Sequence, residues 1–158
     1  MLIRDATPAD AAAACAVLRA SISELCVADH ANDPAILARW LSNKTPENVA
    51  AWTRDASHSL LVAIEDESIV AVGSVRDSGD ITLNYVAPSA RFHGVSTFLL
   101  AALEMRAAER GNVRCSLLST ETAHRFYLAR GYRDDGPPVG QFGARGGYPM
   151  SRRIGDRR

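Results

Sequence analysis

The chain has 158 residues, 47% of them apolar, and its 18 basic residues balance 18 acidic ones. A chain of this length buries roughly two thirds of its unfolded surface, so we expect one domain over residues 1–158 that needs no metal or disulfide for stability. The balanced charge argues against a protein that binds nucleic acid or an anionic membrane.

Cysteine usage and the N-terminus indicate the compartment. Cys15, Cys26 and Cys115 are odd in number and lack the spacing of metal ligands, so we expect three reduced thiols and no metal site. The chain has no long apolar run, and its first residues carry acids and a helix start where a signal peptide has an apolar core. We therefore expect a cytoplasmic protein with no membrane partner.

The first third of the chain is predicted to be mainly helical. After a short strand in "IRD", Thr7 is a helix N-cap with Pro8 at the first helical position, which predicts a helix of about five turns. Two further helix starts follow, at Asp33 before Pro34 and at Thr45 before Pro46.

After Ser57 the pattern changes to strands. The runs "SLLVAI", "SIVAVGSV" and "DITLNYV" are rich in β-branched residues and are separated by turns, so they predict three antiparallel strands. A helix from about Val95 to Arg110 follows, ended by Gly111.

The last third alternates strands with a helix. "VRCSLLS" is a near-continuous apolar run, which is typical of a strand covered on both faces. Thr120 then caps a helix over "ETAHRFYLAR" that ends at Gly131, and "GYRDDG" and "GYPMSRRI" supply two terminal strands around a Gly- and Pro-rich loop. The whole chain is predicted to be α+β.

The segment "ARFHGVSTFLL" places a glycine turn before a helix. Such a turn offers free backbone N–H groups and the positive end of the helix dipole to a phosphate. A P-loop needs a lysine that is absent, and a dinucleotide motif needs an acid where Arg114 stands. A hydrolase nucleophile elbow at Ser96 needs a glycine where Phe98 stands. A plain helix cap remains the other alternative.

Two motifs then point to a family. "YVAPSARFHGVSTFLLAALEMRAAERG" resembles the coenzyme A-binding motif of the GNAT superfamily of N-acetyltransferases, in which Arg/Gln-x-x-Gly-x-Gly/Ala opens a long helix. The run from Ala123 to Tyr132 is similar to the family's second motif, Ala-x-x-Phe-Tyr-x-x-x-Gly-Tyr. Ser96 replaces the usual Gly or Ala, and Thr120 stands where many members have Asn.

The resemblance implies the GNAT acyl-CoA acyltransferase fold. This is a mixed, mostly antiparallel twisted sheet of about six to seven strands, flanked by about four to five helices. The coenzyme A-binding core then covers about residues 80–133. The strand that ends at Val86 is expected to bulge away from its neighbour and to leave a free edge.

The implied activity is transfer of an acetyl group from acetyl-CoA to a primary amine of a small molecule or protein, by direct attack in a ternary complex without a metal. A non-catalytic acyl-CoA-binding sensor of the same fold is the alternative, and a hydrolase using Ser96 is a third. Homodimers are common in the family, so the resemblance also allows a homodimer.

The resemblance also assigns residues. The expected acetyl-CoA contacts are Leu83, Tyr85, Val86, Arg91, Phe92, His93, Gly94, Val95, Ser96, Thr97, Thr120 and Tyr127. Within this set, a backbone N–H near Tyr85 or Val86 is expected to face the thioester carbonyl.

Acetyl transfer requires proton movements that suggest further residues. A tyrosine, with an ordinary pKa of about 10, can protonate a departing thiolate, and Tyr127 occupies the family's tyrosine position. The candidate base is Asp80, where many members carry a strand glutamate, and ordered water is the alternative. Asp29, His30 and Asn84 are the candidates for binding the acceptor, with the loop "PPVGQFGARGGYP" beside them.

Overall fold

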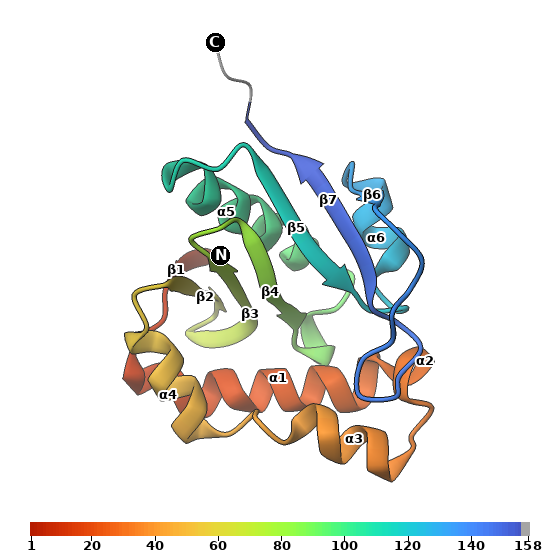
Figure 1. Cartoon of the computed structure of the whole chain (residues 1–158). Coiled ribbons are helices and arrows are strands. Elements are labelled where there is room, and N and C mark those ends of the chain that lie inside the picture. The colour runs from red at the N-terminus through yellow and green to blue at the C-terminus, as the bar shows by residue number, and fades with distance from the viewer. Residues whose placement is uncertain (156–158) are drawn as a thin grey trace.

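A computed structural model describes residues 1–155 of the chain as one seven-stranded sheet with helices on both faces (Figure 1). The strands are β1 (Leu2–Asp5), β2 (His58–Glu65), β3 (Ser68–Arg76), β4 (Asp80–Val86), β5 (Arg114–Ser119), β6 (Arg133–Asp134) and β7 (Tyr148–Arg153). The helices are α1 (Ala11–Leu25), α2 (Val27–His30), α3 (Pro34–Leu41), α4 (Pro46–Arg54), α5 (Val95–Glu109) and α6 (His124–Ala129), with 3₁₀ turns at Pro8–Asp10 and Pro88–Ala90.

The sheet is mostly antiparallel. Its strand order is β1-β2-β3-β4-β5-β7-β6, and β4 with β5 is the one parallel pair within the described residues. This α+β architecture confirms the fold class expected from the sequence, including the seven strands. None of the helices in residues 1–155 is long and apolar enough to cross a membrane.

Helices α1 and α5 lie on opposite faces of the sheet (Figure 1). Leu18 of α1 packs with Val62 and Val72 in one buried cluster. Leu99 and Leu103 of α5 pack in a second cluster on the other face. The sheet is therefore the central layer between two apolar cores.

Two of the three helix starts predicted in the first third of the chain are confirmed by side-chain hydrogen bonds, whereas Thr7 precedes a 3₁₀ turn and α1 begins only at Ala11. The side chain of Asp33 accepts from the backbone N–H groups of Ala35 and Ile36, and the side chain of Thr45 accepts from Asn48. These bonds satisfy N–H groups that have no partner within the helix.

Strand β4 contains a bulge that changes which face its side chains meet. Ser74 of β3 pairs with Leu83, but the next residue, Val75, pairs with Ile81, so Thr82 is the extra residue. Ile81 consequently lies in the core cluster on the α5 face and Val86 packs against the same cluster, although the two residues are five positions apart and would face opposite sides of a regular strand. The expected bulge is thus located at Thr82.

Three sequence expectations need correction. The short helix α2 had no capping signal and was not predicted. Helix α6 begins at His124 rather than at Glu121, because the backbone N–H groups of Glu121 and Thr122 are held in a turn by Asp29. Strand β5 is not covered on both faces, since Leu118 is exposed.

Gly73 sets the distance between β3 and α5. A Cβ atom at this position would lie 2.9 Å from Leu103 Cδ1 and 3.1 Å from Leu99 Cδ2. The absence of a side chain therefore lets α5 lie close against the middle of the sheet.

We expect Gly73→Val to lower the melting temperature by roughly 3–10 °C, because overpacking of a core costs about 1–3 kcal/mol. Gly136→Val is the control, since a Cβ atom at Gly136 meets nothing within 4 Å. Thermal unfolding followed by circular dichroism measures both. Equal melting temperatures for the two variants would contradict close packing at Gly73.

Candidate functional site

The candidate site is a cavity of about 470 Å³ where β4 and β5 separate. The two strands pair only at their start, Asp80 with Ser116 and Ile81 with Leu117, and then diverge (Figure 1). The edge of β4 from Thr82 to Val86 is therefore without a strand partner on the β5 side. Helices α1, α5 and α6 contribute the remaining walls.

The N-terminus of α5 forms one end of the cavity. Gly94 has φ of +77° and Phe92 has φ of +68°, so left-handed residues precede the helix. No side chain caps the helix, and the first hydrogen bond there runs from the Phe98 N–H to the Gly94 carbonyl at 3.2 Å. The N–H groups of Val95, Ser96 and Thr97 are left for a bound group.

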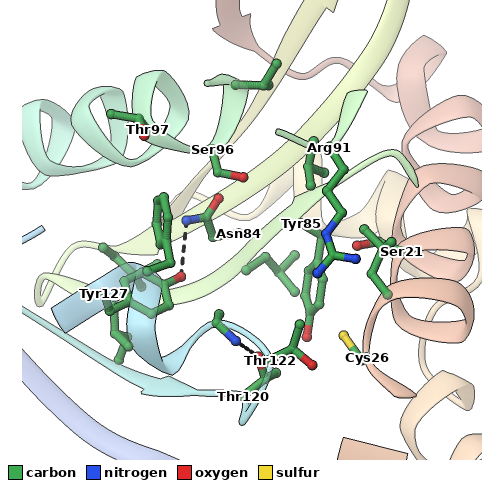
Figure 2. Close-up of a pocket in the computed structure, with 18 of the residues that line it drawn as sticks. Ser21, Cys26, Asn84, Tyr85, Arg91, Ser96, Thr97, Thr120, Thr122 and Tyr127 are labelled. Atoms are coloured by element: carbon green, nitrogen blue, oxygen red, sulfur yellow. Dashed lines mark hydrogen bonds between the residues drawn. The ribbon is translucent and has the colours of Figure 1, made fainter. Parts of the chain in front are cut away.

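Two arginines are the charged side chains that line the cavity. The Arg130 Nε donates to Thr97 Oγ1 at 3.3 Å, and its guanidinium lies 4.9 Å from the centre of the Phe126 ring, so this cation is placed beside the start of α5. The Arg91 side chain reaches toward the opposite wall, where Figure 2 shows its guanidinium between Tyr85 and Ser21. The cavity is therefore positive at both ends.

Tyr127 points into the cavity from α6 and is held by Asn84 of β4. The Asn84 Nδ2 donates to Tyr127 Oη at 3.1 Å (Figure 2). Because this bond uses a lone pair of the phenol, the phenolic hydrogen stays available for another acceptor. Burial raises the pKa of Tyr127 to about 12, although the Asn84 bond acts in the opposite direction.

The other amide atom of Asn84 has no partner. Its Oδ1 is buried and accepts no hydrogen bond from any described residue. A buried acceptor left unpaired costs free energy, so this atom is suited to receive an N–H or O–H from a bound molecule.

The environment of Cys26 shows how the cavity changes the pKa of a thiol. It lines the cavity near Ser21 and Tyr85 (Figure 2), and its side chain is 4% exposed. Burial raises its pKa to about 12, with Asp29 adding to the increase and Arg91 opposing it. Burial therefore disfavours a thiolate in this environment, as it disfavours the phenolate of Tyr127.

Asp29 supports the cavity from outside its lining. Its carboxylate accepts from the backbone N–H groups of Glu121 and Thr122 at 2.6 and 3.1 Å, and from Thr122 Oγ1 at 2.7 Å. These bonds fix the loop between β5 and α6, and Thr120 Oγ1 adds a bond from the Ala123 N–H at 3.0 Å. The loop in turn places α6 and Tyr127.

Most residues expected from the sequence meet in this cavity. Those lining it are Leu83, Asn84, Tyr85, Val86, Arg91, Phe92, Gly94, Val95, Ser96, Thr97, Thr120 and Tyr127. The lining does not include His93, Asp80, Asp29 or His30.

The residues outside the lining have other environments. Asp80 accepts from Ser116 Oγ at 3.2 Å, where β4 and β5 are still paired. Both ring nitrogens of His30 face backbone groups, Nε2 the Ile22 carbonyl and Nδ1 the Asn32 N–H. The structure therefore brings neither Asp80 nor His30 to the cavity.

Sequence reasoning missed Arg130, Cys26, Ser21 and Thr122 as lining residues. Arg130 carried a signal, because it lies four positions after Phe126 on the same helix face. Cys26 and Ser21 carried none, since their position depends on how the end of α1 meets the sheet.

The nucleophile-elbow interpretation of Ser96 finds no support in the geometry. Ser96 lies in the first turn of α5, and within residues 1–155 its hydroxyl has no hydrogen bond to a histidine or a carboxylate. A serine nucleophile requires such a base within hydrogen-bonding reach.

The comparisons with known proteins agree with this geometry. Residues 23–152 match the family model of an acetyltransferase (GNAT) domain, whereas no curated protein sequence matches. A GCN5-related N-acetyltransferase from Rhodopseudomonas palustris is 24% identical, with a TM-score of 0.83 over 96% of this chain and 94% of that one.

Two further solved structures have the same fold. The PaiA N-acetyltransferase from Thermoplasma acidophilum, in complex with coenzyme A, is 14% identical, with a TM-score of 0.82 over 96% of this chain and 98% of that one. The ribosomal-protein-alanine N-acetyltransferase from Brucella melitensis is 25% identical, with a TM-score of 0.74 over 97% and 99% of the two chains.

We expect Asp29→Ala to lower stability by about 2–4 kcal/mol, because two partly buried N–H groups and the Thr122 hydroxyl lose a charged acceptor. Asp29→Asn, which keeps one acceptor oxygen, should recover part of this loss. Asp33→Ala is the control for a more exposed cap and should cost about 1 kcal/mol. Urea unfolding measures all three, and equal losses for Asp29→Ala and Asp33→Ala would contradict the structural role of Asp29.

Proposed function

This chain belongs to the GNAT family of acetyltransferases, and from that premise we propose that it transfers an acetyl group from acetyl-CoA to a primary amine of a small molecule or protein. The acceptor attacks directly, in a ternary complex. The observation that carries the proposal is the divergence of β4 from β5, which opens one cavity between an uncapped helix N-terminus and a buried tyrosine hydroxyl.

The residues present fit the co-substrate. The free N–H groups at the start of α5 suit a pyrophosphate, and Arg130 adds a positive charge beside them. The unpaired Asn84 Oδ1 suits an amide N–H of the pantetheine arm. When bound, acetyl-CoA supplies the acetyl group as a thioester.

The free edge of β4 supplies a donor for the thioester carbonyl. The Ala87 N–H bonds the Val70 carbonyl on the β3 side. Successive residues of a strand turn their N–H groups to alternate edges, so the N–H of Val86 faces the cavity edge, while that of Tyr85 faces β3. We therefore assign the stabilisation of the developing oxyanion to Val86.

Tyr127 is the proposed acid. Its phenolic hydrogen is free of Asn84, and its pKa of about 12 keeps it protonated throughout the physiological range. Burial also raises the pKa of Cys26, a thiol in the same cavity, so a departing thiolate there is expected to accept the Tyr127 proton more readily than it would in water.

The proton of the acceptor amine has no side-chain base in the cavity. Within residues 1–155 the lining contains no Asp, Glu, His or Lys, and Asp80 lies where β4 and β5 are still paired. We therefore assign deprotonation of the amine to ordered water.

The proposed function is tested first by co-substrate binding. Acetyl-CoA at 100 times its dissociation constant should add about 2.7 kcal/mol of stability, seen as a higher melting temperature. Gly94→Asp should abolish this increase, because the new carboxylate faces the phosphates, while Gly94→Asn, which also tolerates a positive φ, should retain most of it. An increase in melting temperature that persists in Gly94→Asp would contradict pyrophosphate binding at the N-terminus of α5.

Turnover is tested with a free-thiol assay over a panel of amines. Tyr127→Phe should lower kcat about 10²–10³-fold and leave the acetyl-CoA dissociation constant nearly unchanged, because only the transferable proton is lost. The rate should rise from pH 6 to 9 as the acceptor amine loses its proton, without a decline below about pH 10, since Tyr127 titrates near 12. Wild-type turnover in the Tyr127→Phe variant would show that Tyr127 is not the acid.

A further inference from the structure

The charges around the cavity restrict the acceptor. Among the described residues, Arg91 and Arg130 are its charged lining residues and no carboxylate lines it. The nearby carboxylate of Asp29 is occupied by Glu121 and Thr122. A second ammonium group on an acceptor would therefore meet positive charge without compensation, which disfavours polyamines and other polycations.

The two arginines serve different parts of the cavity. Arg130 is hydrogen-bonded to Thr97, in the first turn of α5. The Arg91 guanidinium instead lies on the α1 side, between Tyr85 and Ser21 and above Cys26 (Figure 2). The effect of Arg91 on the pKa of the Cys26 thiol, which it lowers, agrees with this position.

Within the described residues, the Arg91 guanidinium lies beside an aromatic ring and has no ion pair. Its guanidinium carbon lies 4.6 Å from the centre of the Phe92 ring, a cation–π distance. Phe92 itself has φ of +68° and is 88% exposed, so this contact lies at the protein surface. Among residues 1–155, no carboxylate neutralises Arg91.

We infer that Arg91 binds a carboxylate of the acceptor, so that the acceptor is a primary amine that also carries a carboxylate, as an amino acid does. This inference rests on the proposed acetyl transfer. A planar guanidinium binds a carboxylate through two parallel hydrogen bonds, which orients the bound molecule as well as attracting it. The lining of the same cavity includes the hydroxyl groups of Ser21 and Thr122 and the apolar side chain of Leu25.

This assignment differs from the role that the sequence suggested for Arg91. The family motif implies a contact with the pyrophosphate, but the side chain extends away from the uncapped end of α5, where Arg130 supplies the cation. Arg91 is thus a specificity-determining residue for the acceptor.

The test uses the full chain and begins with acetyl-CoA binding by calorimetry. The twenty amino acids, their carboxamides, and spermidine are then compared as acceptors in the free-thiol assay. The best amino acid should exceed its own carboxamide at least 10-fold in kcat/KM, and spermidine should be the poorer substrate. A best acceptor that is a carboxamide or spermidine would overturn the inference and leave the proposed function intact.

Arg91→Gln and Arg130→Gln form a matched pair. In Arg91→Gln, kcat/KM for the best amino acid should fall toward kcat/KM for its carboxamide, so that their ratio approaches one. The acetyl-CoA dissociation constant should change less than threefold. Arg130→Gln should weaken acetyl-CoA binding and preserve the ratio. If Arg91→Gln instead weakens acetyl-CoA binding and leaves the ratio of the two kcat/KM values unchanged, Arg91 binds the pyrophosphate and the inference is wrong.

Failure of the proposed function gives a different result. A chain that neither binds acetyl-CoA nor releases thiol with any amine overturns the acetyltransferase proposal, and the acceptor inference with it. A chain that binds acetyl-CoA but acetylates no member of the panel overturns the amino-acid class.

Discussion

The separation of β4 from β5 is the constraint on which the rest of the site depends. Parallel strands in a sheet normally continue to pair along their shared length, but these two pair over only two residues each. The bulge at Thr82 explains how β4 separates from β5. The extra residue bends the strand and changes the direction of the side chains that follow. Asn84 then faces Tyr127, while Tyr85 packs toward the α1 side.

The two helices around this opening are positioned by contacts outside it. Gly73 admits Leu99 and Leu103, so α5 lies against the centre of the sheet, and its N-terminus reaches the free edge of β4. On the other wall, Asp29 fixes the loop that begins α6. A residue predicted as an acceptor ligand is therefore part of the support for Tyr127, and its carboxylate has no oxygen left unbonded.

The sequence predicted local features better than spatial ones. The capping residues Asp33 and Thr45, the strand runs and the glycine before α5 each carry their signal within a few neighbouring residues. The role of Asp29 and the direction of Arg91 depend on contacts between segments that are far apart in the chain, and no local pattern encodes them. Likewise, Leu118 appeared buried on composition alone, because its exposure arises from the departure of β4.

Burial in this fold favours the neutral form of each group that acetyl transfer requires. It raises the pKa of the Cys26 thiol and of Tyr127 to about 12, and it lowers the pKa of the buried Lys44 amine. An amine brought into the cavity is subject to the same desolvation, which lowers the pKa of its ammonium form. The amine therefore loses its proton more readily, while a departing thiolate gains one more readily. This opposite response of the two reactants reduces the need for a dedicated base, which agrees with a lining that contains neither carboxylate nor imidazole.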